Sequence, residues 1–160
     1  MPMIDLPLAR QHLKIDVGDT TEDTLVTQYT NSATSACEGY CNRKFYATQT
    51  ALDTDYAAAR TALDDARTAR DTALEGVTDC DTRSIITDRY NSQRAACLRR
   101  IHGIVVDDTI RAAILMMLGH FYRNRQEVVV AQYSGATQLP AGAKRILEPY
   151  LWIGDLGGEA

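Results

Sequence analysis

Six cysteine and histidine side chains are the residues of this sequence that best suit metal binding. They are Cys37, Cys41, Cys80, Cys97, His102 and His120. Structural zinc sites use thiolate and imidazole ligands, but at short, paired spacings that these residues do not follow. Unpaired cysteines commonly pack in protein cores. We therefore expect packing here rather than a zinc site, and we expect no cofactor.

Adjacent carboxylates are the second chemical feature, because two carboxyl groups can share general acid and base roles. They occur at 64–65 and at 107–108. The pair at 107–108 stands where a helix cap is expected, and the pair at 64–65 lies in a stretch of mixed charge. The sequence contains no nucleophile elbow, metalloprotease motif, phosphate-binding loop or dinucleotide fingerprint. We therefore predict that the protein is not an enzyme.

Three arginines near the middle of the chain could contact phosphate groups: Arg94, Arg99 and Arg100. Nearby aspartates counter them, and the net charge of the chain is −4, which does not favour non-specific binding to nucleic acid. We favour a solvated or subunit-facing charge pattern. A DNA-binding packaging or regulatory helical module remains the alternative.

The elements that must position these residues are organised around residues 107–130, the most strongly apolar stretch. At 100° per residue its large apolar side chains share one broad arc of a helix. Such an apolar face must be covered by other parts of the protein rather than exposed to water. The other side carries small and polar residues, including Ala112, Ala113 and Gly119, and we interpret them as room for a neighbour. His120 lies there too and is expected at a packing or subunit interface. The core residues expected from this helix are Ile110, Ile114, Met117 and Phe121.

Three further helices are expected, and the second and the last of them should pack on this one. A short helix spans 6–14, and a second begins at Asp19 as its cap and ends near Asn42. The apolar face of the second helix runs along Leu25, Tyr29, Ala33, Ala36 and Tyr40, with Val26, Cys37 and Cys41 alongside. The last helix starts at Pro140, places Ile146 and Leu147 in the core, and stops before Pro149, which should push Glu148 out of helical geometry.

An alanine-rich segment at 50–101 predicts a helical hairpin. Its arms are expected at 51–76 and 82–101, and the first carries a thin stripe of mostly small apolar residues. Such a stripe buries little area, so the two arms are expected to pack on each other. We interpret the hairpin as an insertion in a single domain that spans 1–160.

The fold class that follows is all-α, with a small helical bundle as its core. Before the last helix, the β-branched run Val128, Val129, Val130 and the nearby Tyr133 indicate a long loop or a short β-arm, which could pair with a neighbouring subunit. Residues 153–160 are expected to form a flexible tail. The amino end lacks the features of a signal peptide and no apolar run is long enough to span a membrane, so we expect a soluble intracellular protein.

Two separated blocks of the sequence carry a resemblance to a known family. The residues that carry it are Glu38, Tyr40 and Arg43, then Tyr122 and Arg125, then Leu139, Pro140 and Gly142, followed by Leu147, Pro149 and Tyr150. In this order they resemble the head–tail connector (adaptor) proteins of long-tailed bacteriophages. The resemblance covers about 4–47 and 105–152, and the segment at 50–101 is longer than is usual in that family.

The resemblance implies a structural virion protein that forms a ring with copies of itself, typically twelvefold, beneath the portal protein. Such a ring extends the DNA channel and meets a head-completion or tail-completion protein, while DNA passes through without sequence-specific binding and no membrane is involved. Its place would be the head–tail junction of the virion, and the host cytoplasm during assembly. Our candidates for the subunit or portal interface are Tyr122, Arg123, Arg125, Val128, Val129, Val130, Tyr133 and Trp152.

Overall fold

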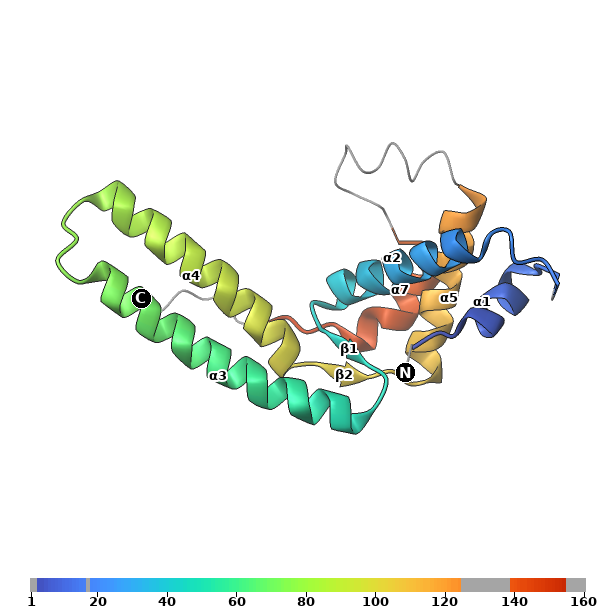
Figure 1. The fold of residues 1–160 in the computed structure, drawn as a ribbon, viewed down its shortest axis with the longest axis horizontal. Helices are drawn as coiled ribbons and strands as arrows, with labels where there is room; N and C mark the ends of the chain where they lie inside the picture. Colours follow the sequence, from blue (N-terminus) through green and yellow to red (C-terminus); the bar gives the residue numbers. More distant parts are fainter. Residues whose placement is uncertain (1–2, 17, 125–138, 155–160) are drawn as a thin grey trace.

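The computed structural model describes residues 3–16, 18–124 and 139–154, and these residues form an all-α fold. One group of helices is compact, and two long helices project from it as a hairpin (Figure 1). The compact group contains α1 (Leu6–Leu13), α2 (Asp23–Cys41), α5 (Asp108–Arg123), α7 (Ala141–Leu147) and the 3₁₀ helix η1 (Glu148–Tyr150). The hairpin consists of α3 (Gln49–Leu74) and α4 (Cys80–Ile101).

The centre of the compact group is α5, as its apolar arc predicts. Asp107 caps it, since a carboxylate oxygen of Asp107 accepts a hydrogen bond from the backbone N–H of Ile110 at 2.8 Å. Helices α1, α2 and α7 pack around α5 (Figure 1). Its buried side chains are Ile110, Ala113, Ile114, Met117, Leu118 and Phe121. The helix ends at Arg123, and the predicted extension to 130 and the loop or β-arm after it lie outside the described residues.

The small residues of α5 do not leave room for another subunit at every position. A Cβ on Gly119 would come within 3.3 Å of the imidazole Nε2 of His12, and Gly142 of α7 lies directly against Met116. Ala113 is fully buried, and only Ala112 remains exposed. Helices α1 and α7 of the same chain fill most of this space, so the close neighbours expected beside the small residues come from within the chain.

The inward face of α2 differs from the predicted one. The buried line is Val26, Thr30, Ala33, Cys37 and Cys41. Leu25, which we expected in the core, is half-buried and lies outside the cluster of core residues, and Tyr29 is half-buried with its ring centroid 6.4 Å from that of Phe121. Since neighbouring residues of a helix point about 100° apart, a helix centred on Val26 turns Leu25 aside.

The start of α2 also differs. Asp19 does not cap the helix, because its carboxylate accepts hydrogen bonds from the backbone N–H of Thr21, at 3.0 Å, and from the Thr21 hydroxyl. These bonds close a turn before the helix, which begins at Asp23. Asp23 receives a hydrogen bond from Arg10 Nε of α1 at 2.6 Å, so this ion pair ties the first two helices together.

The last helix follows the prediction at its ends but not in the backbone of Glu148. Pro140 is the N-cap of α7, Leu147 is fully buried and Ile146 packs half-buried against the core. Glu148 keeps helical backbone angles (φ −53°, ψ −41°), and the chain tightens into η1, which contains Pro149. Pro149 therefore ends the α-helix by lacking a backbone donor rather than by extending the residue before it.

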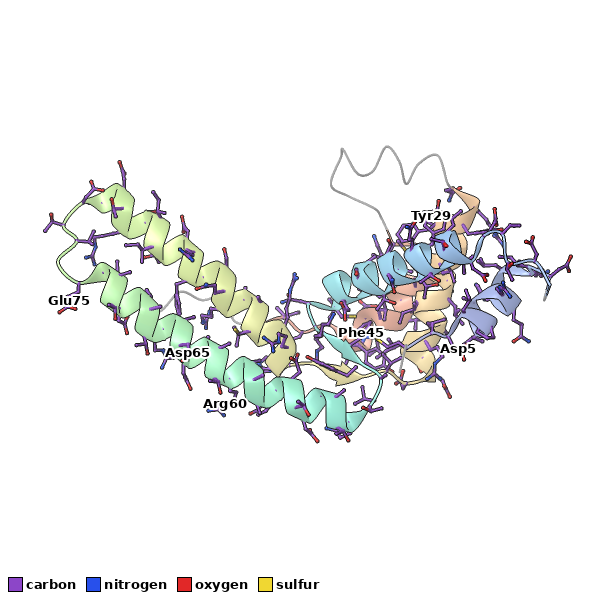
Figure 2. The ribbon with its side chains drawn as sticks, in the orientation of Figure 1. Asp5, Tyr29, Phe45, Arg60, Asp65 and Glu75 are labelled. Carbon is purple, nitrogen blue, oxygen red and sulfur yellow. The ribbon has the colours of Figure 1, made fainter. Side chains whose placement is uncertain are left out.

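The hairpin lies within two residues of its predicted arms and has its own apolar seam. Its buried residues are Ala59 of α3 and Tyr90 and Cys97 of α4, whereas Tyr56 of α3 is exposed. The Arg70 guanidinium covers the Tyr90 ring at 4.3 Å. The core cluster around α5 has no described member from α3 or α4. Charged side chains such as Asp65 point outward from the hairpin (Figure 2).

Two short parallel strands join the hairpin to the core. They are β1 (Phe45–Tyr46), which precedes α3, and β2 (Ile104–Val105), which follows α4. Gly103 enters β2 so close to the Tyr46 ring that an added Cβ would overlap it, and that Cβ would also lie 2.9 Å from the carbonyl oxygen of Arg100. Only glycine fits between these neighbours.

Substituting Gly103 with alanine should lower the free energy of unfolding by about 1–2 kcal/mol, since the backbone or Tyr46 must move. Gly39 provides a matched control, because an added Cβ there meets nothing within 4 Å and the residue lies in α2. Gly39→Ala should instead stabilise by about 0.5–1 kcal/mol, the difference in helix propensity. Urea unfolding followed by circular dichroism measures both, and equal effects of the two substitutions would contradict this packing.

Candidate subunit interface and hairpin joint

Five of the eight candidate interface residues lie outside the described part of the chain: Arg125, Val128, Val129, Val130 and Tyr133. The other three lie at two places. Tyr122 and Arg123 are in the last turn of α5, and Trp152 follows η1 at the base of the hairpin. The structure therefore does not bring these three together in one patch.

The Tyr122 side chain makes contacts within the chain. The Tyr122 ring packs against the core, and its hydroxyl donates a hydrogen bond to the Glu22 carboxylate at the start of α2. Arg123 is exposed. In the same turn, His120 Nδ1 lies 3.1 Å from the side-chain nitrogen of Asn124. Of the end of α5, then, Arg123 is the described candidate that faces solvent.

Trp152 bridges the core and the hairpin. Its backbone N–H donates to the carbonyl oxygen of Cys41 at 3.0 Å, and its indole stacks on the imidazole of His102, with ring centroids 4.2 Å apart and planes 21° apart. Cys41 ends α2, and His102 directly follows α4. We expected Trp152 at a subunit or portal interface, and within the single chain it lies half-buried at this contact.

A polar clamp of Tyr46, Asp55 and Arg100 holds the base of the hairpin. Asp55 of α3 accepts two hydrogen bonds from the Arg100 guanidinium of α4, at 2.9 and 2.5 Å, and a third from the Tyr46 hydroxyl. The bond from Arg100 is the main reason why the pKa of Asp55 lies below its ordinary value. Burial and the neighbouring Asp55 raise the pKa of Tyr46. The clamp is thus a charged, bidentate pair with a neutral phenol attached.

Glu38 organises the neighbouring strand. One oxygen of its carboxylate accepts from the backbone N–H of Phe45 at 2.8 Å, and the group pairs with the Lys44 ammonium at 3.1 Å. The backbone of Lys44 also forms two hydrogen bonds with the segment that leads from α4 into β2. Its N–H donates to the carbonyl of Arg99 and its carbonyl accepts from the N–H of Ile104, each at 2.9 Å. Figure 2 places Phe45 between the core and the hairpin.

Of the carboxylates that we weighed for catalysis, Asp107 and Asp108 have structural partners. Asp107 also accepts a hydrogen bond from the Tyr150 hydroxyl at 2.6 Å. Burial alone would raise the pKa of Asp107, but this bond and those from backbone N–H groups lower it overall. Asp108 pairs with Arg111, and Asp64 and Asp65 are exposed on α3. A carboxylate whose lone pairs are taken by a helix cap and a phenol is poorly placed as a base.

Three of the four cysteines are buried packing residues. Burial raises the pKa of Cys37 to about 12 and that of Cys41 to about 11, so both remain thiols near neutral pH. Cys97 is buried in the hairpin seam and Cys80 is exposed. Within the described ranges, no three histidine, cysteine, aspartate or glutamate side chains gather as a metal site would require.

The His102–Trp152 stack should make stability depend on pH. Partial desolvation of this otherwise exposed imidazole, together with the nearby Arg43, lowers the pKa of His102 below 6.5 in the folded protein. Neutral His102 therefore contributes its full stability above pH 6.5, and that contribution is lost as the pH falls from 6.5 through the folded-state pKa. His102→Gln should remove this part of the pH dependence, while His12→Gln should leave it. Urea unfolding between pH 7 and about 5 tests this, and parallel wild-type and His102→Gln curves would contradict it.

Sequence reasoning missed both the clamp and the stack. Asp55 and Arg100 are far apart in the chain, and nothing in their local sequence marks either one. They become a plausible pair only when the two arms are aligned antiparallel from the turn at residues 75–79, which brings both to the base of the hairpin. No comparable alignment predicts the contact of His102 with Trp152, because Trp152 lies near the carboxyl end of the chain and not on the other arm of the hairpin.

Comparison with known proteins identifies no relative: no family model matches this chain, and neither a curated protein nor a solved structure does. Across the part of the chain that the structure describes, every helix is too short or too polar to cross a membrane.

Proposed function

We propose that this protein is a ring-forming head–tail connector of a long-tailed bacteriophage, which docks under the portal, extends the DNA channel and joins the capsid to the tail. One observation carries the proposal. The motif blocks that resemble this family are far apart in the sequence, yet they lie on α2, α5 and α7, which pack on one another (Figure 1).

Several of these motif residues have defined structural roles in that packing. Glu38 holds the strand that follows α2, and Tyr122 ties the end of α5 to the start of α2. Gly142 lets α7 approach Met116, and Tyr150 bonds to the cap of α5. If the family has a common fold, its motif residues should hold the helices together. The motif residues of this chain do so, and this supports the resemblance at the level of the fold.

The alternative, a DNA-binding module, depends on the hairpin arginines. Arg100 is held by Asp55, and Arg99 Nε donates to the side chain of Asn42 at 2.8 Å. Arg94 is half-buried. Contacts within the chain thus engage two of the three side chains that would neutralise phosphates, which favours the connector over the DNA-binding module.

Electron microscopy of the protein, alone and mixed with the portal protein encoded by the same genome, tests the proposal. We expect rings that stack coaxially on the portal. A protein that stays monomeric and ignores the portal would refute the proposal. A gel-shift series across salt concentration tests the alternative, since micromolar binding to duplex DNA that is lost on adding salt would favour it.

We expect the compact helices to fold without the hairpin. Residues 48–102 are replaced by about six Gly and Ser residues, a linker that reaches up to ~20 Å and so spans the gap between neighbouring strands. Because the core cluster takes no described residue from α3 or α4, far-UV circular dichroism should lose only the share of those two helices. A larger loss, or a melt that is no longer cooperative, would show that the hairpin is part of the core.

A further inference from the structure

The hairpin is attached to the core at a small number of places. The apolar core cluster stops at β1 and Val106, and the buried hairpin residues Ala59, Tyr90 and Cys97 are not part of it. The attachments are the strand pair, the Tyr46–Asp55–Arg100 clamp, the hydrogen bonds of Arg99 with Asn42 and with the backbone of Lys44, and the stack of Trp152 on His102. A body that is held without a shared apolar core keeps its direction only through such individual contacts.

The contacts of the clamp and of the carboxyl-terminal segment are at different points of the joint. The clamp links α3, α4 and β1, so it lies where the hairpin leaves the strand pair. The segment at 151–154 runs from η1 to the end of α4 (Figure 1), where Trp152 stacks on His102. Its backbone is fixed to the core by the bond to Cys41 and by a longer one, 3.5 Å, from the Asn42 amide to the carbonyl of Trp152.

We propose that residues 151–154 form a strap that sets the angle of the hairpin to the core, with the Trp152 indole as its contact on the hairpin. One attachment point permits rotation about itself, whereas a second, displaced point removes that freedom. The strap and the Arg99–Asn42 hydrogen bond supply the second point, on the α4 side. The direction of the hairpin and the position of the carboxyl-terminal segment are therefore coupled.

The length of the hairpin makes this coupling consequential. α3 has 26 residues, so at 1.5 Å per residue the tip lies about 39 Å from the joint, and a swing of about 10° would move it by roughly 7 Å. A partner that lifted Trp152 from His102 would redirect the whole arm. This inference concerns the single chain and does not depend on ring formation or on the proposed function.

A distance measurement between two spin labels tests the strap in the full-length protein. Cys80 is exposed at the tip of the hairpin and takes the first label, whereas the other cysteines are buried. Gln28→Cys, at an exposed position of α2, takes the second. With Trp152 present we expect one narrow distribution of distances. Trp152→Ala should broaden it by several ångströms, and Ile153→Ala should not, because the neighbouring Ile153 side chain is 91% exposed.

Two further variants separate loss of the strap from loss of folding. His102→Ala removes the same stack from the hairpin side and should broaden the distribution as Trp152→Ala does, whereas Trp152→Phe keeps a stacking ring and should stay narrow. Far-UV circular dichroism confirms that each variant retains its helices. If the distribution in both Trp152→Ala and His102→Ala is as narrow as in Ile153→Ala, the other attachments hold the hairpin and the strap is refuted.

Discussion

Replacing Ile114 with alanine should lower the free energy of unfolding by about 3–4 kcal/mol, the largest effect that we expect from a single substitution. Ile114 is fully buried at the middle of α5, with Ile110, Met117 and Leu118 buried in the same helix. Removing three carbon atoms there forfeits their transfer free energy and leaves a cavity, because three helices hold the surrounding side chains in place.

Ile85 provides the matched control for Ile114. The two residues have the same side chain in a helix, but Ile85 lies on α4 with 69% of its surface exposed. Ile85→Ala should change the free energy of unfolding by less than about 0.5 kcal/mol. Urea unfolding followed by circular dichroism measures both. A cost below about 1.5 kcal/mol for Ile114→Ala would mean that α5 is not the centre of the core.

Replacing Asp55 with alanine should cost about 2–3 kcal/mol, the second large effect. The substitution leaves the Arg100 guanidinium and the Tyr46 hydroxyl at the base of the hairpin without their shared acceptor. The two charged side chains are each about one-third exposed (33% and 31%), which places the cost below that of breaking a fully buried pair. Asp65→Asn, at an exposed position of the same helix, is the control and should be nearly neutral.

Acid should weaken the clamp in the same way. The folded-state pKa of Asp55 lies below 3.8, so its contribution to stability is complete above that pH and is lost as the pH falls through the folded-state pKa.

A double-mutant cycle of Asp55→Ala with Arg100→Met isolates the interaction free energy of the pair. Additive effects of the two substitutions would show that Asp55 and Arg100 do not stabilise each other.

Helices were the most predictable part of this protein, because the pattern that defines them is local. The apolar residues of α5 recur at helical spacing, so the buried set Ile110, Ile114, Met117 and Phe121 could be read without knowing what covers it. Pro140 and Asn42 mark helix ends in the same local way. The two arms of the hairpin followed from the alanine-rich composition and a short polar turn.

The rotation of α2 was less predictable, since its sequence offers two adjacent apolar lines. Leu25, Tyr29 and Ala36 form one line, and Val26, Cys37 and Cys41 form the other. Which line turns inward depends on where α5 and α7 lie, and the structure selects the second. Helical periodicity limits the inward face to one arc of the helix. It does not fix the rotation of the helix about its axis to better than about one residue, or 100°.

The sequence by itself determined an all-α protein with a central apolar helix and a long, alanine-rich hairpin. Only the tertiary structure decided that α1 and α7 fill the space beside Gly119 and Met116, and that Trp152 lies against His102. Helix formation depends on residues a few positions apart, which the sequence displays directly. The contacts at the joint pair residues many positions apart, and their partners are defined only once the helices have packed.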